Sequence, residues 1–420
     1  MEKLIIESCP ALHGEVVISG AKNSSLPILA ATILAAGSYH ISNIPALRDI
    51  RTMFKLLKNV GIDSSFENNS AVLTNNDSEE FEAPYELVKT MRASILVLGP
   101  LLAKKGRAKV SLPGGCAIGE RPVDLHIAAL EKMGAKIEVK DGYIFAECDK
   151  LTGKEIIFDK VTVTGTENIM MAAAIAEGTT ILKNAAQEPE VQDLADFLRK
   201  MGAQIEGDGT NTITIHGVEK LHSADHEVMA DRIEAGTFLC AVAGVGGDIT
   251  LKKCPVYALD AVIEKLRHAG LEINIIDDET INAKMSGKIK AVNVQTAPYP
   301  AFPTDMQAQF MAVMLKSDGV SVINESIFEN RFMHVPELKR MGADISLNDS
   351  NAVVKGVPHF SGAPVMASDL RASAGLVIAA LMADHTSSVH RIYHLDRGYE
   401  GFEKKLNKLG AKIVRAEDNE

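Results

Sequence analysis

The segment LEKMGAKI (130–137) decides the fold, because it recurs in five further versions along this chain of 420 residues. The other versions are LKNVGI (57–62), FLRKMGAQI (197–205), KLRHAGLEI (265–273), LKRMGADI (338–345) and LNKLGAKI (406–413). Their glycines are separated by 73, 68, 68, 72 and 68 residues: Gly61, Gly134, Gly202, Gly270, Gly342 and Gly410. Each version follows an apolar helical period and precedes a short alternating strand. The glycine is therefore expected to be the left-handed residue that ends a helix.

A second repeated feature is a very apolar, alanine-rich helix that precedes each version. These helices are predicted at residues 25–37, 92–106, 167–178, 232–246, 305–319 and 370–385. A helix that is apolar nearly all round is buried rather than merely amphipathic. Each repeat thus contains one buried helix, one amphipathic helix and short strands. Six such repeats predict an α/β fold of two domains, each with three repeats of about 70 residues, buried helices and outer sheets.

The repeat count also predicts the domain boundaries. Residues 1–20 precede the first buried helix and have the pattern of strands, so we expect them to complete the sheet of the C-terminal domain. The predicted domains are 22–229 and 1–21 plus 230–420. A chain of this length provides each of them with its own core.

Composition excludes several classes of function. Hydrophobic residues make up 46% of the chain and charged residues 24%, which is ordinary for a soluble globular protein. The formal net charge of −11 argues against nucleic-acid binding, which needs a basic surface. Five cysteines without a C-x-x-C pair favour a reduced cytoplasmic protein over a disulfide framework or a metal site. No secretory signal or membrane-spanning segment is predicted, and so no membrane partner.

The positions of six cations indicate an anion site. They lie just before or within the first turn of predicted helices: Lys22, Arg92, Arg121, Arg331, Arg371 and Arg397. A cation there is disfavoured by the helix dipole, by up to ~1 kcal/mol. One structural interpretation is that Asp49, Asp124 or Asp369 caps these helices while the cations reach solvent. Six cases in an acidic chain favour the other interpretation, a site for phosphate and carboxylate groups.

The segment SLPGGCAIGERPVDLH (111–126) contains the best candidate for a reactive side chain. Pro113, Gly114 and Gly115 cannot continue a regular element, so Cys116 is expected on a loop. Nearby cations would make its thiol reactive. The segment imitates a phosphate-binding P-loop, but Glu120 replaces the required lysine, and no G-x-G-x-x-G follows a strand. A nucleoside triphosphatase is therefore rejected.

Six motifs together resemble the UDP-N-acetylglucosamine 1-carboxyvinyltransferase family of the EPSP synthase-like superfamily. They are SGAKNSSLP (19–27), PGGCAIGERPVDLH (113–126), FPTDMQAQF (302–310), ENRF (329–332), SDLRASAG (368–375) and LDRGYEGF (395–402). The resemblance covers essentially the whole chain. It implies two inside-out α/β barrel domains with the active site in the cleft between them.

The resemblance also implies a reaction. The enolpyruvyl group of phosphoenolpyruvate is transferred to the 3′-hydroxyl of UDP-N-acetylglucosamine, and phosphate is released. This reaction is the first committed step of peptidoglycan synthesis, and hence serves cell-wall biogenesis, cell shape and division. No metal or organic cofactor is implied.

By this resemblance, Cys116 is the general acid and the thiol that forms a covalent adduct, including one with fosfomycin. Asp305 lies at the sugar hydroxyl, as base or in the last proton transfer, although it could also be the N-cap of its helix. Phosphate is held by Lys22, Arg121 and Arg397, and the carboxylate side by Arg331 and Arg371, with Arg92 joining from the other domain. The implied sugar-nucleotide contacts are Asn23, Arg121, Pro122, Val123, Asp124, Leu125, Thr162, Val163, Thr164, Asp305 and Ile327.

Two further polar residues at predicted helix starts are interpreted as structural. Asp231 is expected to cap a helix. His126 could lie beside the ligand, but a histidine in the first turn of a helix is more often solvated or hydrogen-bonded locally. In the segment KVTVTGTEN (160–168), the glycine is displaced by one position from the pattern of many family members, which affects the contacts expected near Thr164.

Three other functions are alternatives to the enolpyruvyl transfer to UDP-N-acetylglucosamine that the resemblance implies. The sister enolpyruvyl transferase acts on shikimate 3-phosphate, but it lacks the loop with Cys116 and the RPVDLH segment. An RNA-terminus-modifying relative is disfavoured by the acidic charge. A silent UDP-sugar-binding relative is disfavoured by the presence of Cys116, Asp305 and every expected cation.

Overall fold

The chain forms two compact units in a computed structural model that describes residues 2–89, 91–112 and 123–418. The first unit contains the described residues from 20 to 229, and the second contains 2–19 and 230–418. The sequence had placed these boundaries at 21/22 and 229/230. Each unit has its own core, with no buried apolar residue shared between the two clusters.

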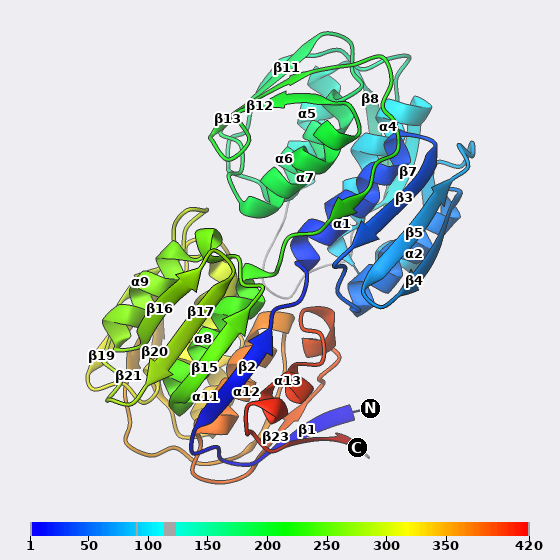
Figure 1. Ribbon diagram of the computed structural model, residues 1–420. Coiled ribbons are helices and arrows are strands. Elements are labelled where there is room, and N and C mark those ends of the chain that lie inside the picture. Colours follow the sequence, from blue (N-terminus) through cyan, green and yellow to red (C-terminus); the bar gives the residue numbers. More distant parts are fainter. Residues whose placement is uncertain (1, 90, 113–122, 419–420) are drawn as a thin grey trace. The chain divides into compact units, whose positions relative to one another are not determined.

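The six repeats share an order of inner helix, strand, second helix and one or two further strands, which can be followed along the colours of Figure 1. The inner helices of the first unit are α1 (Lys22–Ala31), α4 (Leu98–Lys105) and α6 (Val163–Ala173). Those of the second unit are α8 (Arg232–Val245), α10 (Gln307–Met314) and α12 (Leu370–Met382). Short 3-10 turns extend three of them: η1 (Thr32–Leu34), η2 (Arg92–Val97) and η4 (Thr304–Met306). Within each unit these helices pack against one another, and nearly all their residues are buried, as their composition predicted.

The second helix of each repeat is shorter or amphipathic, and each ends at the repeated glycine. These helices are α2 (Arg48–Asn59), α5 (Asp124–Lys132), α7 (Pro189–Lys200), α9 (Asp260–Ala269), α11 (Val335–Arg340) and α13 (Phe402–Lys408). The six glycines have φ between +85° and +107°. L residues rarely adopt this conformation, so the prediction of a left-handed glycine at each corner is confirmed. The remaining short helices are α3 (Tyr85–Val88), η3 (Val256–Ala258) and η5 (Leu395–Arg397).

Each repeat contributes a four-stranded sheet in which one edge pair is parallel and the other pairs are antiparallel. In the first unit, one sheet has the order β14 (His226–Glu227), β3 (Gly37–Ser42), β5 (Ser70–Asn75) and β4 (Ile62–Glu67). A second has the order β6 (Glu82–Ala83), β7 (Arg107–Ser111), β9 (Tyr143–Glu147) and β8 (Lys136–Lys140). A third has the order β10 (Glu155–Ile157), β11 (Thr179–Lys183), β13 (Thr212–His216) and β12 (Gln204–Glu206). Because β14 follows the third repeat yet pairs with β3 of the first, the ring of three repeats is closed.

The sheets of the second unit follow the same plan. One sheet has the order β16 (Glu272–Asp277), β17 (Thr280–Met285), β15 (Gly247–Lys252) and β2 (Leu12–Val17). A second has the order β18 (Val294–Gln295), β19 (Val320–Asn324), β21 (Asn351–Lys355) and β20 (Asp344–Asn348). A third has the order β22 (Pro364–Met366), β23 (Ser387–His390), β1 (Glu2–Ile6) and β24 (Ile413–Glu417). The N-terminal strands therefore complete two of its sheets. β2 pairs in parallel with β15, and β1 lies between β23 and β24.

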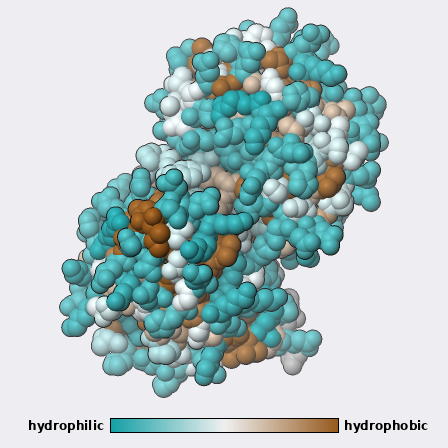
Figure 2. Space-filling model, in the orientation of Figure 1, coloured by the Kyte–Doolittle hydropathy of each residue, from teal (hydrophilic) through white to brown (hydrophobic). Residues whose placement is uncertain are grey.

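The outer surface carries single apolar residues of the strands rather than one large patch. Figure 2 shows a mostly hydrophilic face with a few separate hydrophobic groups. Val17, Val72, Ile276 and Val414 are examples of strand residues that are about half exposed. Scattered exposure of this kind is normal for a soluble protein.

Candidate active site

The predicted site residues divide between the two units. Cys116, Arg121 and Pro122 lie outside the described residues. The second unit contains Asp305, Ile327, Arg331, Arg371 and Arg397. The first unit contains Lys22, Asn23, Arg92, Val123, Asp124, Leu125, Thr162, Val163 and Thr164.

Asp305 lies in η4 and is paired with two arginines. Its carboxylate accepts hydrogen bonds from Arg331 Nη2 at 2.9 Å and from Arg371 Nε at 3.1 Å. The arginine side chains are only 4% and 1% exposed, whereas that of Asp305 is 25% exposed. The N-cap interpretation of Asp305 is wrong, since no side chain caps η4 or α10. Charge-assisted bonds to two buried guanidinium groups are stronger than a capping bond, and they leave the carboxylate as the accessible end of the cluster.

Arg371 rests on a buried polar network. Its guanidinium lies 5.2 Å from the centre of the Tyr399 ring. The Tyr399 hydroxyl is 2.9 Å from Thr237 Oγ1, and Gln309 Nε2 donates to Tyr399 Oη at 3.0 Å and to the Asp305 carbonyl oxygen at 2.9 Å. Burial lowers the pKa of Arg371, but Tyr399 and Asp305 raise it above its ordinary value, so the side chain stays charged. The network thus fixes both the position and the charge of Arg371.

The start of α12 brings further charges near this cluster. Asp369 caps α12 by accepting from the backbone N–H groups of Arg371 and Ala372 at 2.8 and 2.9 Å, as the capping interpretation expected. Burial lowers the pKa of His334 to about 4, so this side chain is neutral. Arg397 is half-buried at the end of η5, and its charge adds to burial in lowering the pKa of His394.

In the first unit, Lys22 and Asn23 begin α1. Lys22 Nζ lies 3.6 Å from Asp49 Oδ2, and both side chains are at least nine-tenths buried. Asp49 is in the first turn of α2 and pairs with a cation instead of capping the helix. Arg92 is the half-buried first residue of η2. The prediction that cations occur at helix starts is therefore confirmed for Lys22 and Arg92, and in the second unit for Arg371.

His126 joins the two segments predicted to contact the sugar nucleotide. His126 belongs to α5, which begins at Asp124, and its Nε2 is 3.4 Å from Thr164 Oγ1 in the first turn of α6. Thr162 caps α6 by accepting from the Gly165 N–H at 3.2 Å. The starts of α5 and α6, with Val123, Leu125 and Val163, are thereby connected.

The His126 ring is buried and neutral, so the expectation of a solvated or locally bonded side chain is wrong. Asn168 Oδ1 accepts from the Gly99 N–H, which orients the amide so that its Nδ2 donates to His126 Nδ1 at 2.9 Å. The ring proton is then on Nε2 and points to Thr164. Burial lowers the pKa of His126 to about 4.

The sequence did not single out Asn168, Gln309 or Tyr399. Asn168 and Gln309 are polar residues inside buried helices, and this conflict was the available signal. Asp231 caps α8 through the N–H groups of Ile233 and Glu234, as expected.

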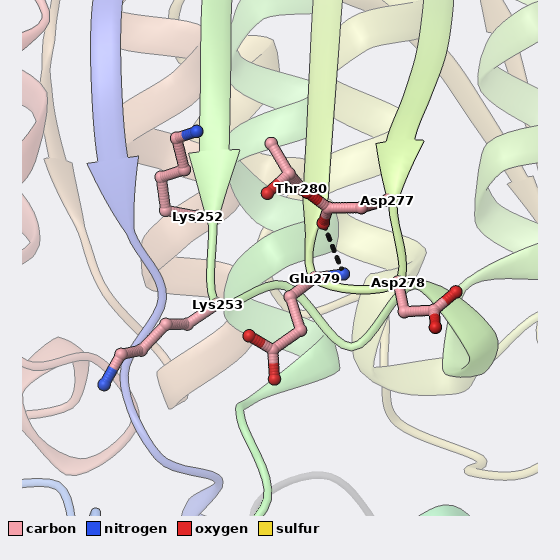
Figure 3. A pocket seen from close by; sticks show the side chains of 6 residues that line it. All are labelled: Lys252, Lys253, Asp277, Asp278, Glu279 and Thr280. Atoms are coloured by element: carbon pink, nitrogen blue, oxygen red, sulfur yellow. Dashed lines mark hydrogen bonds between the residues drawn. The ribbon is translucent and has the colours of Figure 1, made fainter.

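A surface pocket elsewhere in the second unit does not coincide with these residues. It is lined by Lys252, Lys253, Asp277, Asp278, Glu279 and Thr280 at the β16–β17 turn. Figure 3 shows the side chains of Lys253, Asp278 and Glu279 diverging from one another, while Asp277 accepts from the Glu279 N–H at 2.9 Å. Nothing there converges on a ligand.

The described part of the chain lacks the features of two other classes of protein. Among residues 2–89, 91–112 and 123–418, no three or more His, Cys, Asp or Glu side chains group as a metal site. No helix in this described part is long and apolar enough to cross a membrane.

Solved structures define the class of protein. The enolpyruvyl transferase NikO from Streptomyces tendae is 25% identical, with a TM-score of 0.89, and the likeness covers 99% of this chain and 98% of that one. An EPSP synthase from Acinetobacter baumannii is 18% identical, with a TM-score of 0.75, over 99% of this chain and 100% of that one, and shows the fold alone. The predicted two-domain α/β fold of enolpyruvyl transferases is confirmed.

Sequence comparison defines the family. The pattern of the EPSP synthase (3-phosphoshikimate 1-carboxyvinyltransferase) family matches residues 6–406. A UDP-N-acetylglucosamine 1-carboxyvinyltransferase from Geotalea uraniireducens (strain Rf4) is 57% identical over 418 residues, which cover 100% of both chains. The chain therefore belongs to the EPSP synthase family of carboxyvinyltransferases, and the resemblance carried by its six motifs is confirmed.

Proposed function

We propose that this protein transfers the enolpyruvyl group of phosphoenolpyruvate to the 3′-hydroxyl of UDP-N-acetylglucosamine and releases phosphate, as the first committed step of peptidoglycan synthesis. The observation that carries the proposal is the 57% identity, over the full length, to a UDP-N-acetylglucosamine 1-carboxyvinyltransferase. The clustered arginines agree with an anionic small-molecule substrate, which needs only a local group of cations in an acidic chain.

In the proposed reaction the sugar oxygen bonds to C2 of phosphoenolpyruvate while the methylene carbon gains a proton. The tetrahedral intermediate then loses phosphate and a methyl proton, which restores the double bond. Asp305 is proposed to receive the hydroxyl proton or to act in the last proton transfer, because its carboxylate is accessible and held by two buried guanidinium groups. Cys116 is proposed as the acid that protonates the methylene.

The remaining residues are proposed to bind the substrates. Lys22, Arg121 and Arg397 hold phosphate, while Arg331 and Arg371 serve the carboxylate side, and Arg92 joins them from the other domain. The proposed sugar-nucleotide contacts are Asn23, residues 121–125, Thr162, Val163, Thr164, Asp305 and Ile327. The link through His126 supports treating the starts of α5 and α6 as one binding surface.

A cytoplasmic location belongs to the same proposal. Cys9, Cys148, Cys240 and Cys254 are all free thiols, which suits a reducing compartment.

The role of Cys116 can be tested with the epoxide fosfomycin. Cys116→Ala is expected to abolish covalent inactivation, which mass spectrometry would register as the absence of a drug adduct. Cys116→Asp should escape the drug and retain activity, because a carboxyl group can also deliver a proton. Alkylation and inactivation of the alanine variant would contradict the assignment.

The acceptor can be tested by phosphate release from phosphoenolpyruvate in a metal-chelating buffer, with UDP-N-acetylglucosamine and shikimate 3-phosphate in parallel. Release with the sugar nucleotide alone is expected. Release with shikimate 3-phosphate alone would assign the sister activity, and silence with both would favour a binding protein.

A further inference from the structure

Glu325 is a buried carboxylate that receives four hydrogen bonds next to Asp305. It follows β19 directly and is 2% exposed. Its Oε1 accepts from Thr296 Oγ1 at 2.9 Å and from the backbone N–H groups of Ile327 and Phe328 at 2.9 and 3.2 Å. Its Oε2 accepts from Thr304 Oγ1 at 2.8 Å. A buried carboxylate that accepts from this many donors is held in one orientation.

The bond from Thr304 fixes the direction of a longer chain of hydrogen bonds. The single hydroxyl proton of Thr304 is donated to Glu325, so towards Arg331 the Thr304 oxygen can only accept. Arg331 Nη1 lies 3.3 Å from that oxygen, while Nη2 of the same guanidinium donates to Asp305 at 2.9 Å. The orientation of Arg331 towards Asp305 thus depends on which way the Thr304 proton points.

We propose that Glu325 is a positioning residue that couples the backbone at Ile327 to the Arg331–Asp305 pair. One oxygen holds the Ile327 loop, and the other sets the hydroxyl against which Arg331 is aligned. The inference rests on the proposed function, in which Ile327 and Asp305 both contact the sugar nucleotide. Seating of the acceptor at Ile327 is then linked to the geometry of the Asp305 carboxylate.

The alternative is that Glu325 only ties down its own loop. Glu325→Gln separates the two, because the Ile327 and Phe328 N–H groups can only donate and must face the amide oxygen. The amide nitrogen then faces Thr304, whose hydroxyl must accept from it, and the Thr304 proton turns towards Arg331. Two donors meet there, and Arg331 loses its alignment although the loop keeps its bonds.

The test is a double-mutant cycle of Glu325→Gln and Thr304→Val, measured as kcat at saturating substrates. Each variant is expected to lose about tenfold in kcat, since each removes the same bond to a charged group. The double variant should be no worse than the poorer single variant. Thr304→Ser, which keeps the hydroxyl, should stay within about twofold of wild type. Thr296→Val removes a donor on the loop side only and should raise the KM for the sugar nucleotide without lowering kcat.

Several results would overturn the inference. They are an unchanged kcat in Glu325→Gln, losses that multiply in the double variant, or a Thr304→Ser variant as impaired as Thr304→Val. The free energy of unfolding, measured for the same cycle, needs no substrate. Coupling in the free energy of unfolding without coupling in kcat would show that Glu325 has a structural role only. The proposed function would still stand in that case, because the wild-type protein turns over UDP-N-acetylglucosamine. A wild-type protein that does not use UDP-N-acetylglucosamine would instead overturn the proposed function and the inference with it.

Discussion

The two units share one repeat, but the starts of α10 and α12 in the second unit differ in charge from the start of α6 in the first. In the second unit, the polar groups near the starts of α10 and α12 are charged, with Asp305 held between Arg331 and Arg371. In the first unit, the start of α6 carries hydroxyl groups that face a neutral His126. Both arrangements are supported by a buried amide, Gln309 or Asn168, on an inner helix.

This difference shows that the fold provides the helix starts, whereas the side chains decide whether the cluster there is charged or neutral. The repeat provides equivalent helix starts, whose first backbone N–H groups have no partner within the helix itself. A charged cluster there suits the orientation of a reacting group, because electrostatic stabilisation is strongest from preorganised charges. A neutral cluster suits recognition by hydrogen bonds. We therefore expect substitutions in the charged cluster around Asp305 to change turnover most, and those in the neutral cluster around His126 to change binding or stability.

The largest expected effect is that of Asp305→Asn. It keeps the size of the side chain but removes the charge, so kcat should fall by about a hundredfold or more. Affinity for UDP-N-acetylglucosamine, measured by calorimetry, should change far less. Asp208→Asn is the matched control, because it breaks an aspartate–arginine pair of the first unit, with Arg199 at 2.8 Å. Equal losses of activity in both variants would remove the contrast between the units.

A smaller effect is expected for Arg397→Ala. Loss of one charge-assisted contact should raise the KM for phosphoenolpyruvate by about tenfold or more, with little change in sugar-nucleotide binding. Steady-state kinetics with each substrate varied in turn would measure this. Arg267→Ala, at the exposed end of α9, serves as the control. A parallel loss for both substrates would argue against a phosphate-side role for Arg397.

His126 in the first unit and His334 in the second are buried histidines that each predict a pH dependence of stability. The folded-state pKa of His126 and of His334 is lowered from 6.5 to about 4, whereas the unfolded chain protonates near 6.5. Stability is thus fully present above about pH 6.5 and declines towards pH 4, by about 1.4 kcal/mol per pH unit for each histidine. Denaturant unfolding between pH 7.5 and 5 should show this slope.

Substitution of one histidine at a time tests the comparison. His126→Asn and His334→Asn should each remove the contribution of one histidine to the slope of unfolding free energy against pH. The exposed His385→Asn should leave this slope unchanged. If the slope were unchanged in both buried variants, the neutral state assigned to these rings would be wrong.

The smallest expected effect is that of Tyr399→Phe. The ring beneath Arg371 remains, but the hydroxyl bonds to Thr237 and Gln309 are lost, at about 1 kcal/mol of unfolding free energy. Denaturant titration would detect this, with the partly exposed Tyr393→Phe as the control. A loss of turnover greater than that of Asp305→Asn would show that Tyr399 acts more directly than its contacts indicate.

Much of the fold could be predicted because its determinants are local. Gly134 and Gly342 end their helices in a left-handed conformation, as the repeated segment predicted. The Ala-rich helices are buried because none of them has a polar face that could meet solvent. The N-terminal strands were expected in the C-terminal domain, and the structure gives their partners, β15, β23 and β24.

The site could be predicted only as a set of residue types. Asp305 was open between a cap and a catalytic role, because its pairing with Arg371 joins residues 66 positions apart. Glu325 gave no local signal, and the only signal for Asn168 was its position in a buried helix, because the partners of both residues are brought together by tertiary packing. Contacts of this kind follow from the fold and not from any window of sequence.

The most direct test of the account is the identity of the product formed from phosphoenolpyruvate labelled with carbon-13 at C2. We expect NMR to show the labelled carbon in an enol ether attached to the 3′-oxygen of UDP-N-acetylglucosamine, with one phosphate released for each product molecule. Asp305→Asn should form this product at least about a hundredfold more slowly. Label that stays in phosphoenolpyruvate, or appears only on shikimate 3-phosphate, would contradict the account.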